Sequence, residues 1–266
     1  MAHASLTDEE ATKMSDEFNG KVVLITGGTS GIGRETAAAF AARGARVVVA
    51  GRREDEGATT VKLIRDNGGE AHFVRADVAQ SAQIAALVEE VVARYGALDI
   101  AFNNAGVEGT PFVPLEKYSE QAWHDVIEIN LTGLFLCMKH QLPHLVKSKG
   151  AMVNMASVAG LTGGRLGAAY YASKHGVVGI TKAAAVEYAD KGVRINAVAP
   201  GVILTEMAER AFFRDPAVTA RIKSMHPMGR LGEPKEVAKA VLWLSSADSS
   251  FTTGHVLSVD GGFVVP

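Results

Sequence analysis

The sequence predicts an α/β fold in which helices cover both faces of a doubly wound, parallel sheet of seven strands. The first observation is an alternation that begins at residue 21, where short runs rich in Val and Ile alternate with longer segments of helical spacing. The second is a glycine-rich turn between the first apolar run and the first helical segment. Together they indicate repeated βαβ units, whose strands pair in parallel.

The individual elements follow from these two periodicities. Short apolar runs bounded by turn residues predict strands at Lys21–Thr26, Arg46–Gly51, Ala71–Arg75, Leu98–Asn103, Ala151–Ser157, Val193–Ala199 and His255–Val259. Apolar residues three and four apart predict helices at Ile32–Ala42, Glu54–Asp66, Ser81–Arg94, Glu120–Val146, Tyr170–Asp190 and Pro234–Ser246.

One domain is expected, because no Gly/Ser-rich linker and no internal repeat divides the chain. Residues 1–20 are polar and acidic, and we expect them to form a flexible tail before a catalytic domain at residues 21–266. Between Gly201 and Gly232 the alternation stops, and a long connection carries several large apolar side chains. This connection predicts a lid over the substrate at about residues 202–232.

Composition narrows the function. The 266 residues include 27 Lys and Arg and 29 Asp and Glu, a formal net charge of −2, so no excess of positive charge attracts nucleic acid or an anionic membrane. No apolar run approaches the roughly 20 residues that span a bilayer, and residues 1–20 lack a secretion pattern. The single cysteine, Cys137, excludes an internal disulfide and fits the reducing cytoplasm. We therefore expect a small-molecule partner.

The glycine-rich turn predicts a dinucleotide site. Gly27, Gly31 and Gly33 follow the first strand and open the first helix, where the backbone must turn tightly and approach a phosphate. The free N–H groups at the helix N-terminus favour an anion such as a pyrophosphate. The spacing is G-x-x-x-G-x-G, and the Gly-Lys-Ser/Thr of a P-loop is missing, which argues against a nucleotide hydrolase.

The end of the second strand indicates which dinucleotide is bound. An acidic residue at this position would accept hydrogen bonds from the adenosine ribose of NAD, whereas this chain has Arg52 and Arg53 after Gly51. Guanidinium groups can grip a phosphate, so the site favours the 2′-phosphate of NADP(H). The alternative is that both arginines are solvated surface charges, in which case NAD(H) remains possible.

Tyr170 and Lys174 form a candidate acid–base pair. They lie four residues apart in a predicted helix, so both side chains project from one face. A nearby ammonium group stabilises a phenolate and lowers its pKa toward neutrality. Tyr171 is the competing phenol, but it lies roughly 100° around the helix from Tyr170. Such a pair is also common on ordinary exposed helices.

Polar residues at the carboxyl ends of two predicted strands support the pair. Ser157 ends the fifth predicted strand, and Asn103 and Asn104 end the fourth, at the edge where open α/β sheets bind their ligands. The Ser157 hydroxyl could hold a carbonyl oxygen. Asn130 lies inside a predicted helix, where an amide needs a specific partner.

This combination resembles the short-chain dehydrogenase/reductase family, in its shorter single-domain branch, over essentially residues 21–263. The resemblance implies a Rossmann-type fold and an oxidoreductase that moves a hydride between a nicotinamide and a ketone or secondary alcohol. The motifs that carry it are Thr26-Gly27-x-x-x-Gly31-x-Gly33, Asp77-Val78, Asn103-Asn104-Ala105-Gly106, Asn130, Ser157, Tyr170-x-x-x-Lys174, Pro200-Gly201 and Val259-Asp260-Gly261-Gly262.

The resemblance also implies a role for each catalytic candidate. Tyr170 is the acid or base, Lys174 lowers the pKa of that phenol and binds the nicotinamide ribose, and Ser157 orients the reacting oxygen. Asn130 supports a water-linked proton path, a role that only the resemblance supplies. The family frequently forms homotetramers, so a homo-oligomer is expected.

The expected dinucleotide contacts surround the glycine-rich turn and the ends of the strands. Arg52 and Arg53 come from the residue argument above, and the resemblance places Asp77 and Val78 beside the adenine and Ile203 and Thr205 beside the carboxamide. The full set is Gly27, Thr29, Ser30, Gly31, Ile32, Gly33, Arg52, Arg53, Asp77, Val78, Asn104, Ala105, Gly106, Tyr170, Lys174, Pro200, Gly201, Ile203 and Thr205.

Other kinds of site and two other functions remain as alternatives. No metal is expected, because the sequence lacks His-Glu-x-x-His and has one cysteine. An enoyl reductase of the same fold would reduce a carbon–carbon double bond, and a dinucleotide-binding scaffold would have lost the chemistry. A mainly apolar substrate pocket is expected around Glu108, Leu161, Thr162, Leu166, Met207, Phe212 and Phe213.

Overall fold

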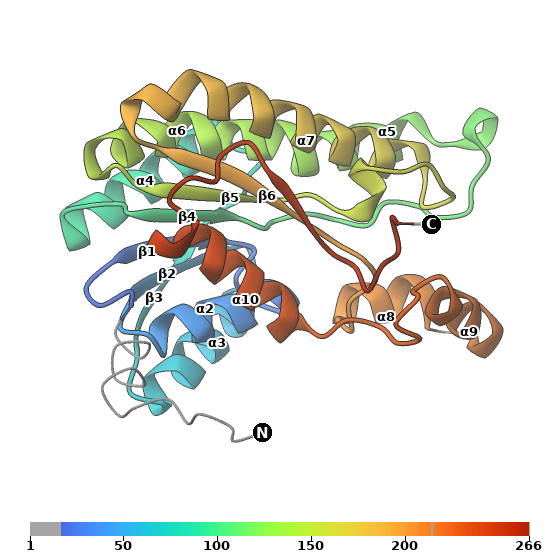
Figure 1. Ribbon diagram of the computed structural model, residues 1–266, viewed down its shortest axis with the longest axis horizontal. Coiled ribbons are helices and arrows are strands. Elements are labelled where there is room, and N and C mark those ends of the chain that lie inside the picture. Colours follow the sequence, from blue (N-terminus) through green and yellow to red (C-terminus); the bar gives the residue numbers. More distant parts are fainter. Residues whose placement is uncertain (1–16, 214, 266) are drawn as a thin grey trace, which may run out of the picture.

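The computed structural model describes residues 17–213 and 215–265, and these residues form a seven-stranded parallel sheet (Figure 1). The strand order is β3-β2-β1-β4-β5-β6-β7. The strands are β1 Val22–Thr26, β2 Arg46–Gly51, β3 Glu70–Arg75, β4 Ile100–Asn103, β5 Ala151–Met155, β6 Arg194–Pro200 and β7 Val256–Val259. The predicted fold class is confirmed. Because β4 lies beside β1, the chain reverses its direction of travel across the sheet there, which opens a crevice at the carboxyl ends of the strands.

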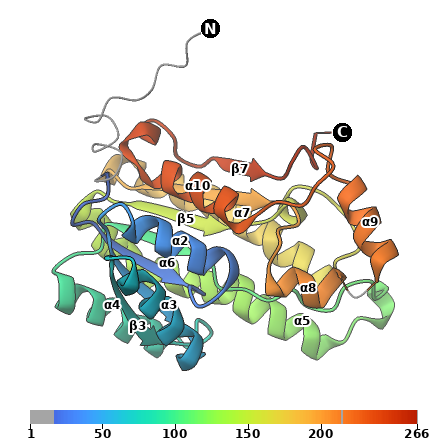
Figure 2. The same ribbon diagram turned by 90° about the horizontal axis from the view of Figure 1, so that it is seen from below.

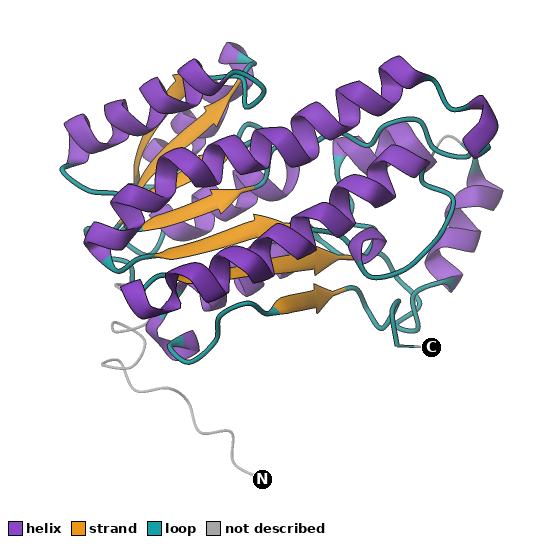
Figure 3. Cartoon of the chain, turned by 90° about the horizontal axis from the view of Figure 1, so that it is seen from above, coloured by secondary structure: helices purple, strands orange, loops and turns teal. Residues whose placement is uncertain are grey.

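Helices cover both faces of the sheet, as Figures 2 and 3 show. Side chains alternate between the faces along each strand, so Leu24 packs under one helical layer and Ile25 under the other. In β1 the side chains on both faces of the sheet are fully buried, which is why such a strand appears in the sequence as a continuous apolar run. The first layer contains α4 Ser81–Tyr95, α6 Gly133–Ser148 and α7 Ala168–Tyr188, and the second contains α2 Gly31–Ala41, α3 Glu54–Asp66 and α10 Pro234–Ser245.

The long helix predicted at residues 120–146 is interrupted. α5 (Glu120–Ile127) runs into a π-helical turn at Glu128–Thr132, and α6 begins at Gly133. A π turn takes up one extra residue and shifts the later apolar positions by that single residue, a change that a pattern of apolar residues three and four apart also accommodates. Such turns occur frequently at functional sites, and this one contains Asn130.

The flexible tail predicted at residues 1–20 extends too far, because the folded part of the chain already includes Phe18. Residues 1–16 lie outside the described residues, but Phe18 is buried and packs edge-on against Phe40, with ring centroids 4.9 Å apart. The Phe18 N–H also donates to the carbonyl of Arg43 at 3.1 Å. A single aromatic residue in a polar stretch has no periodicity, so the sequence gives no sign of its burial.

The predicted lid region contains two short helices, α8 (Glu206–Phe212) and α9 (Pro216–Ser224). A parallel bridge between Ile203 and Gly232 joins the two ends of this connection. Figure 1 shows both helices beyond the carboxyl ends of the strands, beside the C-terminal segment. The described residues of this region therefore include two helices at the edge where the crevice opens.

Within residues 17–213 and 215–265, no helix combines the length and the apolar character that a bilayer span requires. The same residues contain no group of three or more His, Cys, Asp or Glu side chains arranged to hold a metal ion.

Cys137 lies on α6 inside the core, with 1% of its surface exposed. Burial raises the pKa of its thiol to about 12, so thiolate is scarce at neutral pH. We expect the native protein to react with a thiol reagent such as 5,5′-dithiobis(2-nitrobenzoate) at no more than the rate of global unfolding. Full reaction within seconds under native conditions, with one equivalent released as in denaturant, would contradict this burial.

Candidate active site

The turn between β1 and α2 has the geometry of an anion site. Gly27 has φ +64°, and a β-carbon there would lie 2.8 Å from Cα of Ala105. At Gly33 a β-carbon would lie 2.2 Å from the carbonyl oxygen of Gly27, so only glycine fits. The helix begins after Ser30 with no side-chain cap and no acidic residue in its first turn. Its N–H groups are thus left for a ligand in the crevice, and a dinucleotide pyrophosphate fits that description.

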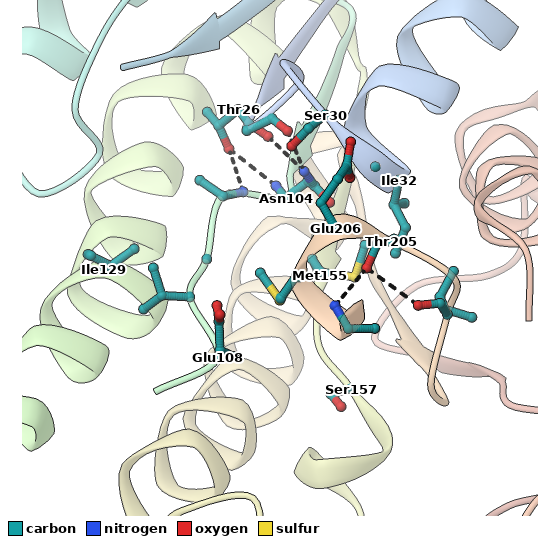
Figure 4. Close-up of a pocket in the computed structure, with 18 of the residues that line it drawn as sticks. Thr26, Ser30, Ile32, Asn104, Glu108, Ile129, Met155, Ser157, Thr205 and Glu206 are labelled. Atoms are coloured by element: carbon teal, nitrogen blue, oxygen red, sulfur yellow. Dashed lines mark hydrogen bonds between the residues drawn. The ribbon is translucent and has the colours of Figure 1, made fainter. Parts of the chain in front are cut away.

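Hydrogen bonds tie this turn to the loop that follows β4. The Asn104 amide donates to the carbonyl oxygens of Thr26 and Gly27 at 3.3 and 2.8 Å. The Thr26 hydroxyl accepts from the N–H groups of Asn104 and Ala105 at 3.2 and 3.4 Å. The close-up in Figure 4 shows Thr26 and Asn104 joined in this way. These hydrogen bonds therefore fix the carboxyl ends of β1 and β4 relative to each other.

Arg52 and Arg53 follow β2 and stand beside the glycine-rich turn. Nη2 of Arg53 donates to the hydroxyls of Ser30 at 2.9 Å and Thr29 at 3.3 Å, and Nη1 of Arg52 lies 3.9 Å from a carboxylate oxygen of Asp77. More than half of each arginine side chain is exposed. Both guanidinium groups can therefore meet a phosphate without first breaking a buried ion pair.

A cavity of about 510 Å³ brings most of the predicted residues together. Of the predicted catalytic and dinucleotide-contact residues, Gly33 and Asn130 do not line it. Those that do are Gly27, Thr29, Ser30, Gly31, Ile32, Arg52, Arg53, Asp77, Val78, Asn104, Ala105, Gly106, Ser157, Tyr170, Lys174, Pro200, Gly201, Ile203 and Thr205.

Ser157 and Tyr170 converge in this cavity from different elements. The predicted strand ends earlier than expected, at Met155, and Ser157 caps a 3-10 turn by accepting from the N–H of Ala159 at 3.1 Å. Tyr170 lies in the first turn of α7. Burial raises the pKa of the Tyr170 phenol, and a hydrogen bond with Ser157 acts in the opposite direction. The two hydroxyls can therefore form hydrogen bonds with the same substrate oxygen.

Lys174 lies one turn beyond Tyr170, with 4% of its surface exposed. Its ammonium donates to the carbonyl oxygen of Met155 at 2.8 Å and stands 5.7 Å from the centroid of the Tyr170 ring. Burial lowers the pKa of Lys174 to about 8. The lysine was expected to lower the pKa of the phenol, but in this structure burial dominates and the pKa of Tyr170 is raised.

The Asn130 side chain holds the loop after β4. Its Oδ1 accepts from the N–H of Val107 at 2.8 Å, and its Nδ2 donates to the carbonyl of Val107 at 2.9 Å and to the Ser173 hydroxyl at 3.3 Å. Asn130 is buried behind the cavity wall. These contacts position the loop that carries Gly106, whereas the proton path remains a prediction from the resemblance.

Two further residues of this region were not predicted. His226 is buried, accepts from the N–H of Val202 through Nε2 at 3.1 Å, and contacts the carbonyl of Ile222 through Nδ1 at 2.8 Å. It thereby ties the end of α9 to the strand end at Gly201. Arg210 of α8 lines the cavity. Single His and Arg residues in a connection without periodicity give no signal in the sequence.

The substrate end of the cavity matches the expectation in part. Glu108, Leu166, Met207 and Phe212 line the cavity, whereas Leu161, Thr162 and Phe213 do not. The Phe212 ring packs edge-on against Phe112 at 6.4 Å between centroids. Apart from charged groups, this end is therefore mainly apolar.

The chain is similar to known proteins over most of its length. The family model described as Enoyl-(Acyl carrier protein) reductase matches residues 27–264. A cyclohexanol dehydrogenase from Acinetobacter sp. (strain SE19) is 45% identical over 251 residues, which cover 94% of this chain and 97% of that protein. A 2,5-dichloro-2,5-cyclohexadiene-1,4-diol dehydrogenase from Sphingobium indicum is 42% identical over 252 residues, 94% of this chain and 99% of that protein. The crystal structure of levodione reductase superposes with a TM-score of 0.89 at 38% identity, covering 92% of this chain and 98% of that chain.

Proposed function

Because the chain belongs to the short-chain dehydrogenase/reductase family, we propose that it interconverts a secondary alcohol on a six-membered carbon ring and the matching ketone. The observation that carries this proposal is that Ser157, Tyr170 and Lys174 line the same cavity as the glycine-rich turn. The similar proteins named above include dehydrogenases of cyclohexanol and of a cyclohexadiene diol, which supports a ring alcohol as the substrate class. The enzyme class and the alcohol–ketone reaction follow from the family, and the ring is the proposed refinement.

The catalytic side chains act on the substrate oxygen. In the direction of reduction, the Ser157 and Tyr170 hydroxyls donate hydrogen bonds to the carbonyl oxygen, where negative charge grows during hydride transfer. Tyr170 then gives its proton to that oxygen, and in the direction of oxidation it takes the proton back. Lys174 carries positive charge close to the phenol, which favours the phenolate left behind. Asn130 positions the loop at Gly106 rather than touching the substrate.

The residues around the glycine-rich turn suit a nicotinamide dinucleotide. Gly27, Gly31 and Ile32 would hold its pyrophosphate on the N-terminus of α2, and Asp77 and Val78 would flank its adenine. When bound, the dinucleotide supplies or accepts the hydride. We propose NADP(H) as the preferred form, since Arg52 and Arg53 stand where an acidic residue would bind the ribose of NAD(H).

The double variant R52A/R53A tests the proposed preference. In the wild type we expect kcat/KM for NADPH to exceed that for NADH, and in the variant kcat/KM for NADPH should fall about 100-fold because two charge-assisted contacts to the 2′-phosphate are lost. The value for NADH should change by no more than about threefold. Initial rates of cofactor oxidation with a cyclic ketone measure both.

Arg75→Ala is the matched control, because Arg75 is exposed at the end of β3, pairs with Glu54 and does not line the cavity. It should leave both cofactors unaffected. If the wild type prefers NADH, or if R52A/R53A loses both cofactors equally, the proposed phosphate grip is wrong while the oxidoreductase proposal stands.

An enoyl reductase is the second candidate, because the description of the matching family model names that reaction. By resemblance, such enzymes space their tyrosine and lysine farther apart than Tyr170 and Lys174. That spacing favours the carbonyl reaction in this chain. A scaffold without catalysis is disfavoured by the convergence of Ser157, Tyr170 and Lys174 in one cavity.

We further propose that the folded chain from about residue 17 is one catalytic domain, that residues 202–232 act as a lid, and that the protein is a cytoplasmic homotetramer. Helix α8 supplies Met207 and Phe212 to the cavity wall, which supports the lid. A buried single thiol fits a reducing compartment, and the family supports the tetramer. Light scattering on the eluting protein would measure the assembly directly.

A further inference from the structure

A charged pair joins two walls of the cavity at its substrate end. Nε of Arg210, on α8, lies 3.3 Å from Oε1 of Glu108, in the loop after β4. The two residues are 102 positions apart in the chain, and both line the cavity. About a quarter of the Glu108 side chain is exposed, against about half of the Arg210 side chain. The pair therefore spans the cavity between the lid region and the rim of the sheet.

Glu108 lines the same cavity as Tyr170, and its negative charge acts on the Tyr170 phenol. Burial is the largest cause of the raised pKa of Tyr170, and the charge of Glu108 raises it further. The field of this carboxylate thus reaches the phenol that is proposed to bind the substrate oxygen. A second negative charge close to it would be repelled.

Arg210 is the cation placed to receive an anionic substrate at this end. Lys174 is committed to the carbonyl of Met155 and lies against Tyr170. Arg52 and Arg53 stand at the opposite end, beside the glycine-rich turn. Glu206, from the same helix as Arg210, points toward that turn, since a β-carbon at Gly31 would lie 3.6 Å from its Oε2.

We propose that the Glu108–Arg210 pair determines specificity for uncharged substrates, because Glu108 occupies the guanidinium that a substrate carboxylate would otherwise bind. This inference rests on the proposed ring-alcohol function and deepens it. A carboxylate that enters the cavity meets the repulsion of Glu108 and finds Arg210 already paired. An uncharged ring meets neither obstacle and packs against Leu166, Met207 and Phe212.

Two ketones of nearly equal size test the proposal: 4-oxocyclohexanecarboxylate and its methyl ester. The wild type should prefer the ester in kcat/KM. Glu108→Gln keeps the shape and removes the charge, so it should raise the acid-to-ester ratio of kcat/KM at least about tenfold. The ratio cancels any effect of Glu108 on the pKa of Tyr170, because both ketones react at the same phenol.

Two comparisons isolate the guanidinium. Adding Arg210→Gln to Glu108→Gln should remove the gain, since no cation then remains to receive the carboxylate. Glu116→Gln replaces an exposed carboxylate in the 3-10 turn Leu115–Lys117 and should leave the ratio at the wild-type value. An unchanged ratio in Glu108→Gln, or the same gain when Arg210 is also replaced, would overturn the proposal.

Binding provides a readout that does not depend on turnover. Titration calorimetry of 4-oxocyclohexanecarboxylate, with NADP⁺ present at saturation, should show at least about tenfold tighter binding to Glu108→Gln than to the wild type. Equal binding would overturn the specificity role even if the ester is reduced normally, for example if Arg210 turns to Glu206 or Glu209 of its own helix. Failure of the wild type to reduce the ester, combined with tighter binding of the acid to Glu108→Gln, would instead reject the proposed ring-ketone function alone.

Discussion

Tyr170→Phe should lower kcat/KM for a cyclic ketone by about 10³-fold, while the protein still folds and binds its dinucleotide. The variant removes one oxygen, which is the proposed proton donor and one of the two donors to the substrate oxygen. The ring remains in α7, so the packing of Ser173 and Lys174 behind it is preserved. Initial rates of cofactor oxidation, together with calorimetric titration of NADPH, separate lost chemistry from lost binding.

Tyr171→Phe is the matched control. Tyr171 is the adjacent phenol on the same helix but does not line the cavity. We expect its rate to stay within about threefold of the wild type. A Tyr170→Phe variant within tenfold of the wild type, or a Tyr171→Phe variant that loses turnover instead, would show that the catalytic phenol is wrongly assigned.

Lys174→Met should have opposite effects on catalysis and on stability. The substitution removes a buried ammonium whose pKa burial lowers to about 8 from 10.5. That shift corresponds to a cost of about 3 kcal/mol for carrying the charge in the folded state at pH 7. Loss of the hydrogen bond to the Met155 carbonyl offsets part of the gain. We expect the free energy of unfolding without dinucleotide to rise by about 1–2 kcal/mol and kcat to fall at least about 10²-fold.

The pH dependence of the free energy of unfolding tests the predicted stabilisation by Lys174→Met a second time. Because the folded-state pKa of Lys174 lies below its unfolded value, the unfolded chain binds more protons between pH 8 and 10.5, and wild-type stability from this group rises with pH there. The advantage of Lys174→Met should therefore be largest below pH 8 and shrink toward pH 10. Lys182→Met, an exposed lysine on the same helix, should show no such trend. A Lys174→Met variant that is less stable than the wild type at pH 7 would contradict the cost assigned to burial.

Much of the fold could be predicted because a doubly wound sheet has a strong local signature. Strands buried on both faces read as short apolar runs, and the helices between them show one apolar face, so the boundaries of β2 and α3 agree with the sequence. The site follows from the topology, since the ends of parallel strands meet at one edge. That is why the sequence alone places Asn104, Ser157 and the glycine-rich turn together, and all three line one cavity.

The features that escaped prediction depend on long-range contacts or on backbone detail. The π turn at Asn130 shifts the apolar positions by only one residue, and the buried Phe18 is one aromatic residue in a polar stretch. The Glu108–Arg210 pair joins residues far apart in the chain, so no local sequence pattern predicts it. The raised pKa of Tyr170 results from the summed burial around it, which only the folded arrangement determines.

The central claim is that this site transfers a hydride to a carbonyl carbon, and deuterium transfer tests it most directly. The enzyme would be given NADPH carrying deuterium at the nicotinamide C4, in both stereochemical forms, with 2-cyclohexen-1-one as the substrate, and the product analysed by NMR. We predict 2-cyclohexen-1-ol with deuterium on the carbon that bears the hydroxyl. Cyclohexanone with deuterium at C3 would instead show reduction of the carbon–carbon double bond and would contradict the assignment of Ser157 and Tyr170 to a carbonyl oxygen.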